Sequence, residues 1–162
     1  MQRTVVAIAL SVWTAVALSI DAGSALAQTE TVIEVTVRGS FDDVKQQLVL
    51  AIENRGLIVN HESKVGEMLE RTGKDLGAAN QIYIRAEVLE FCSATLSRHV
   101  MEADARLLAL CPYGVGIYTL TGEADKVHLV YRRLPWEGAG PAARALQQVD
   151  RLLHEIVQEA GQ

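Results

Sequence analysis

The stretch that decides the fold covers residues 30–59 and reads ETVIEVTVRGSFDDVKQQLVLAIENRGLIV. Its first nine residues are rich in β-branched side chains that alternate on one face, which predicts a strand. Ser40, three positions before Asp43, is typical of a helix N-cap. Apolar residues at helical spacing follow as far as Gly56, which predicts the end of a helix there. A short strand over 57–59 completes a strand–helix–strand unit.

The rest of the chain continues this mixture of helices and strands. The patterns predict a helix over 64–76, a strand over 81–91, a helix over 93–104, hairpin arms over 114–120 and 126–133, and an amphipathic closing helix that begins near Pro141. Within the strand over 81–91, Ile82, Ile84 and Ala86 alternate with polar residues, so we expect them on its buried face. The mixed order and the hairpin predict an α+β fold: a mostly antiparallel sheet with helices packed on one face.

The first 27 residues have the form of a secretory signal peptide. A basic start at Arg3 precedes 17 uncharged residues, Thr4–Ile20, and Ala25 and Ala27 form an A-x-A cleavage site. An uncleaved anchor is the less favoured alternative, because a membrane span needs about 20 apolar residues. We therefore expect cleavage after Ala27, one domain over 28–162, no membrane span after cleavage, and a location in a bacterial periplasm.

The overall charge and the missing motifs narrow the classes of function. The 162-residue chain has a formal net charge of −5, and removal of the signal peptide leaves this value unchanged. Nucleic acids bind to basic surfaces, so we expect no nucleic-acid partner. The sequence has no motif typical of zinc hydrolases, c-type cytochromes or nucleotide-binding enzymes, and its four histidines lack metal-ligand spacing. It indicates no particular cofactor or metal, and it does not favour an enzyme.

The two cysteines, Cys92 and Cys111, are the strongest candidates for chemistry. Both lie at the ends of predicted elements, where neighbouring strands could bring them together. A structural disulfide would close a loop of about 20 residues and stabilise the fold by roughly 3 kcal/mol. Two buried thiols are a second interpretation. The third is a reactive dithiol or a soft-metal or cofactor site, in which a helix N-terminus lowers the pKa of Cys92.

Aromatic and basic residues near the hairpin complete the candidates. The tyrosines there can line a pocket, although aromatic residues on a hairpin usually pack on the sheet. Adjacent arginines can bind an anion, although such pairs are more often solvated or paired with carboxylates. The candidate ligand or redox residues are Cys92, Cys111, Pro112, Tyr113, Tyr118 and Arg132.

The segments around the cysteines resemble a known family. The similarity to the DUF302 family, a domain of unknown function, rests on Phe91-Cys92-Ser93-Ala94, Leu110-Cys111-Pro112-Tyr113, Gly116-Ile117-Tyr118, and Tyr131-Arg132-Arg133 with Pro135. It covers roughly residues 30–135. Two departures are Ser93-Ala94, where Asn-Pro is common, and Pro112, which follows the cysteine here. The resemblance implies an α+β fold, leaves room for a homodimer, and implies no activity.

Two functions follow from these observations. The favoured one is a non-enzymatic periplasmic binding or accessory module for a small molecule or a protein, in which Cys92 and Cys111 form a structural pair. The alternative is a thiol-based redox, sulfur-handling or soft-metal carrier protein that uses the same two cysteines. The first is favoured because the sequence carries no catalytic motif.

Overall fold

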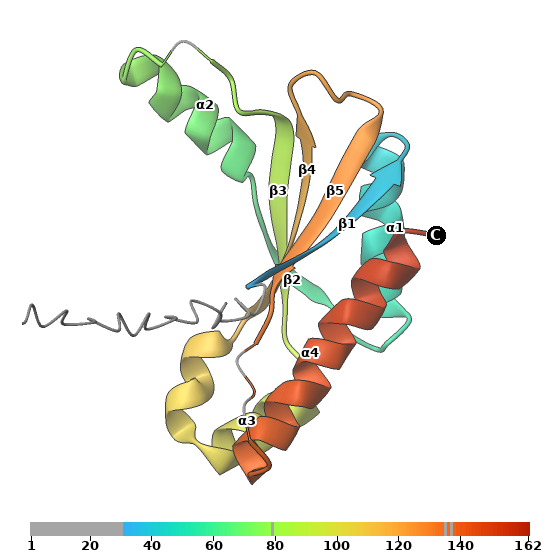
Figure 1. The fold of residues 1–162 in the computed structure, drawn as a ribbon, viewed down its shortest axis with the longest axis vertical. Helices are drawn as coiled ribbons and strands as arrows, with labels where there is room; N and C mark the ends of the chain where they lie inside the picture. The colour runs from blue at the N-terminus through green and yellow to red at the C-terminus, as the bar shows by residue number, and fades with distance from the viewer. Residues whose placement is uncertain (1–30, 79, 135, 137) are drawn as a thin grey trace, which may run out of the picture.

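The fold is one antiparallel sheet with helices against it (Figure 1). The computed structural model describes residues 31–162 apart from 79, 135 and 137, so the predicted signal peptide lies outside the described residues. The elements are β1 (Val32–Arg38), α1 (Phe41–Glu53), β2 (Val59–Ser63), α2 (Val65–Asp75), β3 (Tyr83–Phe91), α3 (Ala94–Ala103), the 3-10 helix η1 (Ala105–Leu110), β4 (Tyr113–Leu120), β5 (Lys126–Arg132) and α4 (Pro141–Ala160).

The five strands lie in the order β1-β5-β4-β3-β2, and every neighbouring pair is antiparallel. Helices α1 and α4 pack against each other and cover one face of the sheet (Figure 1). The predicted α+β architecture, with its late hairpin and closing helix, is therefore confirmed. In the described part of the chain, no helix has the length and apolar character needed to cross a membrane.

The opening strand–helix–strand unit forms as predicted, with one difference. Ser40 caps α1, because its Oγ accepts a hydrogen bond from the Asp43 backbone N–H at 3.2 Å. Gly56 follows the helix with a φ of +71°, in the left-handed region that favours glycine. The difference is the second strand, which begins at Val59 and continues through polar residues to Ser63. It lies at the edge of the sheet, where polar side chains remain solvated.

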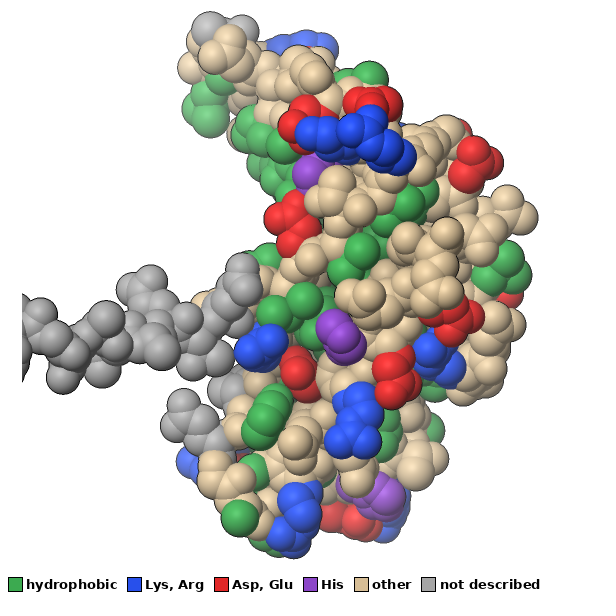
Figure 2. Space-filling model, turned by 45° about the vertical axis from the view of Figure 1, so that its right-hand side comes forward, with side chains coloured by type: hydrophobic (Ala, Val, Ile, Leu, Met, Phe, Trp, Pro, Cys, Tyr) green, Lys and Arg blue, Asp and Glu red, His purple; other side chains and the backbone are tan. Residues whose placement is uncertain are grey.

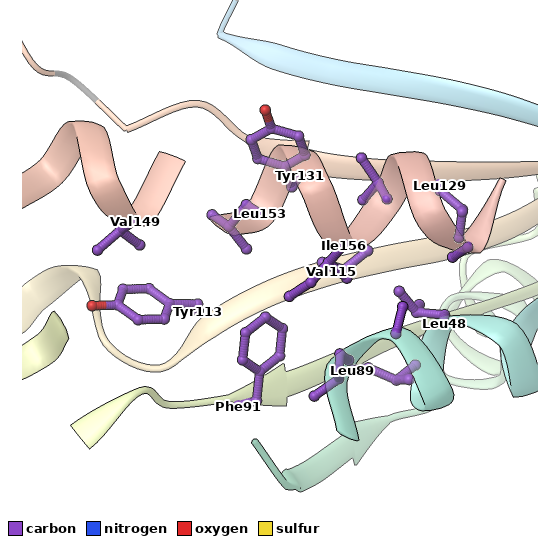
Figure 3. Packing of buried hydrophobic residues seen from close by; sticks show 14 of the residues in the cluster. Leu48, Leu89, Phe91, Tyr113, Val115, Leu129, Tyr131, Val149, Leu153 and Ile156 are labelled. Carbon is purple, nitrogen blue, oxygen red and sulfur yellow. The ribbon is translucent and has the colours of Figure 1, made fainter. Parts of the chain in front are cut away.

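The core lies between the sheet and the two long helices (Figure 3). Its fully buried side chains come from both layers: Leu48 and Ile52 of α1, Val149, Leu153 and Ile156 of α4, and Leu89, Phe91, Val115, Ile117 and Leu129 of the strands. The rings of Phe91 and Tyr113 meet edge to face with centroids 6.4 Å apart. Because a buried side chain of this size contributes roughly 1.5–3 kcal/mol, this layer contact is the main source of stability.

Strand β3 does not present the face that the sequence predicts. Ile82 precedes the strand and Ile84 is 50% exposed, whereas Glu87 is only 4% exposed. A register shift between Tyr83 and Arg85 interrupts the alternation. The prediction that both isoleucines are buried is therefore wrong.

The buried Glu87 carboxylate is tolerated because two cations bind it. It accepts a hydrogen bond from Lys45 Nζ of α1 at 2.6 Å and one from Arg85 Nε at 2.8 Å. Lys45 also contacts Glu62 of β2 at 2.6 Å, so the network joins α1 to two strands. Because its charge is paired in this way, Glu87 can lie buried where the sequence pattern predicts an exposed polar residue.

Helix α2 stands apart from α1 and α4 (Figure 1), and none of its residues is buried. It meets the sheet closely at Gly66, where a Cβ atom would lie 2.7 Å from the backbone nitrogen of Ala86. A larger residue at Gly66 would therefore move the helix away from β3. On the face drawn in Figure 2, acidic and basic side chains are interspersed.

We expect Glu87→Gln to destabilise the protein by about 3 kcal/mol, because it leaves a partly buried lysine and arginine without their shared carboxylate. Urea unfolding at pH 7 measures this change. Glu62→Gln is the matched control, since it removes a 40% exposed carboxylate from the same lysine and should cost less than about 1 kcal/mol. Equal effects of the two variants would show that burial is not what makes Glu87 important.

The same carboxylate gives stability a pH dependence. Burial alone would raise the pKa of Glu87, but the hydrogen bonds from Lys45 and Arg85 outweigh it and hold that pKa below its ordinary value of 4.5. A carboxyl group whose pKa is lower in the folded state stabilises the fold at pH values above its ordinary pKa. This stabilisation is lost as the pH falls through the pKa of the folded state. The difference in unfolding free energy between wild type and Glu87→Gln should therefore be full at pH 7 and shrink below about pH 4. A difference that stays constant down to pH 3 would contradict this.

Candidate functional site

The register of β3 and β4 brings the two cysteines together. Phe91, the last residue of β3, lies opposite Tyr113, the first residue of β4. The chain leaves β3 at Cys92, forms α3 and η1, and returns at Cys111. The two Sγ atoms lie 2.8 Å apart, and both thiols are free and half-buried. The expectation that strand ends place the cysteines side by side is met.

The first turn of α3 supplies a hydroxyl behind the cysteine pair. Ser93 caps the helix through its Oγ, which accepts from the Leu96 backbone N–H at 3.4 Å. One turn later, the buried Ser97 places its Oγ 3.8 Å from Cys111 Sγ and 3.1 Å from the Tyr113 hydroxyl. Figure 3 shows the Tyr113 ring against the core, with its hydroxyl pointing away from Phe91. The cysteine pair thus lies against a small buried polar cluster.

The electrostatics of Cys92 differ from the sequence prediction. Burial raises the pKa of the Cys92 thiol to about 11, and the hydrogen bond with Cys111 adds to the shift. The prediction of a pKa lowered by the helix N-terminus is wrong, because Ser93 caps α3 and Cys92 lies one residue outside it. Burial also raises the pKa of Tyr113, against the opposing effect of the Ser97 hydrogen bond. In reduced Cys92, a pKa raised in this way favours the neutral thiol over the reactive thiolate at pH 7.

A pocket of about 400 Å³ lies directly beside the cysteine pair. Pro112, next to Cys111 across a cis peptide bond, lines it together with Tyr113 and Arg132. Its other lining residues are Glu90, Leu110, Gly114, Leu134 and Leu153. All of the six predicted site residues except Tyr118 thus either line this pocket or belong to the cysteine pair beside it.

Tyr118 is the candidate that the structure places elsewhere. Its ring stacks on His128 with centroids 4.6 Å apart, and its hydroxyl donates to Glu34 Oε1 at 3.2 Å. Burial raises the pKa of Tyr118 to about 12, and the Glu34 carboxylate adds to the shift. His128 also contacts the carboxylates of Glu34 and Glu123. Tyr118 therefore belongs to a polar cluster further along β4, away from the pocket.

Sequence reasoning missed Ser97 and the place of Glu90 in the pocket. Ser97 lies four residues after the cap Ser93, so it shares that face of α3, and this spacing is the signal that could have found it. Glu90 shares a cross-strand row with Gly114, which requires the register to be known. Among the described residues, no group of three or more His, Cys, Asp or Glu side chains could hold a metal ion.

Comparison with known proteins agrees with this fold. The family model described as "Domain of unknown function DUF302" matches residues 33–160. The chain belongs to the DUF302 family. A crystal structure of an uncharacterized conserved DUF302 protein from Bacillus stearothermophilus superposes with a TM-score of 0.65 and 13% sequence identity, covering 81% of this chain and 98% of that one. At this identity the likeness shows the fold alone. No curated protein matches the sequence.

In this DUF302 protein, we expect reduced Cys92 to react slowly with iodoacetamide at pH 7 and faster with each pH unit until about pH 11, because only the thiolate reacts. Cys111→Ala should lower the midpoint of this pH–rate profile, since Cys111 contributes to the raised pKa. Mass spectrometry of the alkylated peptide measures the rate, and glutathione is the reference thiol. A Cys92 that reacts at pH 7 as fast as glutathione would contradict the assignment.

Proposed function

We propose that this DUF302 protein is an exported, non-enzymatic binding module of the periplasm. Its ligand is a small molecule held in the pocket beside Pro112 and Tyr113. The observation that carries the proposal is the pocket itself. Its volume of about 400 Å³ lies in the range of small-molecule sites, and three residues singled out from the sequence line it. The sequence also supports export, through its A-x-A site after a charge-free apolar run.

The lining of the pocket indicates the class of ligand. Glu90 and Arg132 supply opposite charges, and within the described residues neither forms a salt bridge with another side chain. Gly114, opposite Glu90 in the β3–β4 register, adds no side chain to the floor of the pocket. Leucines from η1, α4 and the segment after β5 supply apolar surface. A small zwitterion with an apolar part, such as a free amino acid, matches this lining.

In this proposal the cysteines hold the pocket in shape. Pro112 follows Cys111 directly, so a bond between Cys92 and Cys111 fixes the wall on which Pro112 and Tyr113 lie. The raised pKa of Cys92 supports a structural role, because a neutral thiol is a poor nucleophile. In an oxidising compartment the pair would close a loop of about 20 residues, worth roughly 3 kcal/mol.

A calorimetric titration with the twenty free amino acids, one at a time, tests the proposal. We expect saturable binding of at least one apolar amino acid, weakened about tenfold by Arg132→Gln and by Glu90→Gln, because each removes one charge-assisted contact. Arg71→Gln, which removes an exposed charge from α2, is the matched control and should leave binding unchanged. Absence of binding across the panel, or equal weakening by all three variants, would overturn the assignment of this ligand class.

A second candidate function is thiol-based redox or sulfur handling. The observation that favours it is the 2.8 Å separation of two half-buried free thiols, since such a pair can be oxidised and reduced reversibly. Equilibration in glutathione redox buffers distinguishes the two functions. A disulfide with a potential below about −300 mV is structural, whereas a potential above about −200 mV would favour the redox function.

A further inference from the structure

A second pocket, of about 270 Å³, lies between the end of β5 and helix α4. It shares no lining residue with the pocket beside the cysteines. Arg133 and Trp136 line it from the segment after β5, and α4 contributes Gln147, Asp150, Arg151 and His154. The proposed function uses none of these residues.

Helix geometry explains why α4 presents several polar groups here. Gln147, Arg151 and His154 are spaced four and three residues apart, so they form one row along the helix. Their neighbours Val149 and Leu153 are buried in the core, so the row borders the core-facing side of α4. The sequence therefore places a polar stripe next to the apolar stripe that anchors the helix.

The charge of this pocket favours an anion. It contains two guanidinium groups, from Arg133 and Arg151, and one carboxylate, from Asp150. One oxygen of the Asp150 carboxylate already has a partner, because Oδ1 accepts a hydrogen bond from the Leu134 backbone N–H at 3.2 Å. In the described part of the chain, no carboxylate forms a salt bridge with Arg133 or Arg151.

One atom of this pocket has no hydrogen-bond partner among the described residues. Arg133 Nε is buried and donates no hydrogen bond to any described residue. Leaving a buried donor without an acceptor is unfavourable, so an anion that reaches the Arg133 guanidinium would relieve this cost. A planar guanidinium is suited to carboxylates and phosphates, which can accept two parallel hydrogen bonds.

Trp136 adds a second kind of contact. Its side chain is 38% exposed at the same pocket, although large aromatic side chains are usually buried to a greater extent. An exposed indole beside two arginines offers a flat apolar surface next to an anion site.

We propose that this second pocket binds an organic oxyanion with a planar ring, in which Arg133 and Arg151 donate hydrogen bonds to the carboxylate or phosphate and Trp136 contacts the ring. The net charge of −5 makes the pocket a local exception on an acidic protein. The proposal does not depend on the first pocket, because the two have separate lining residues.

Tryptophan fluorescence gives a direct test, because the chain has only Trp13 and Trp136. In the full chain carrying Trp13→Phe, all tryptophan emission reports on the second pocket. We expect phenyl phosphate or benzoate to change this emission, with saturation at concentrations below about 1 mM. The compound that binds more tightly shows whether the pocket prefers a phosphate or a carboxylate. Phenol, which has the ring without the charge, should bind at least about tenfold more weakly.

Variants separate the site from general charge effects. Arg133→Gln and Arg151→Gln should each weaken binding about tenfold, whereas Arg98→Gln, which removes an exposed charge on α3, should not. Circular dichroism checks that each variant is folded. If Arg133→Gln is unfolded, the effect of Arg151→Gln on binding decides the test, because Arg151 is exposed. The proposal is overturned if neither anion gives a saturable change, if phenol binds as tightly, or if Arg98→Gln weakens binding equally.

Discussion

The antiparallel register that sets Phe91 opposite Tyr113 is the constraint on which the rest of the site depends. It fixes where the chain leaves β3 and where it re-enters the sheet, and it thereby brings Cys92 within 2.8 Å of Cys111. A slip of one residue would turn every side chain of the strand to the other face. The buried rings of Phe91 and Tyr113 oppose such a slip, because both would lose their places in the core. Core packing and site geometry therefore have the same origin.

Helix α4 connects this register to the two pockets. Leu153 belongs to the core and lines the pocket beside the cysteines, whereas Arg151 and His154 line the pocket near Trp136. Nearly adjacent residues of one helix thus line different pockets, because successive side chains of a helix point in different directions. The packing of α4 on the sheet holds both walls in place. Within β3, the buried Glu87 ties that strand to α1 in a comparable way, through its ion pair with Lys45.

Local patterns explain how much of this could be predicted from the sequence. The cap at Ser40, the glycine after α1 and the apolar stripe of α4 act within a few residues, so the sequence predicts these elements and the α+β class correctly. The proximity of the two cysteines was also predictable, because both lie at strand ends. What failed depends on contacts between distant segments. The buried Glu87 needs Lys45 from α1, and the pKa of Cys92 is raised by burial, to which the hydrogen bond with Cys111 adds. Tyr118 looked like a pocket residue because only the sheet register shows that it stacks on His128.

We propose that Cys92 and Cys111 form a structural pair in an exported protein. The most direct test is the intact mass of the protein purified from the periplasm without reductant, before and after alkylation under denaturing conditions. We expect a chain that begins at Gln28, with a mass about 2 Da below that of the reduced form and no alkylation until reductant is added. Two free thiols that are alkylated at once, or extra mass from a metal or sulfur species on either cysteine, would contradict the structural pair and favour a redox or carrier function.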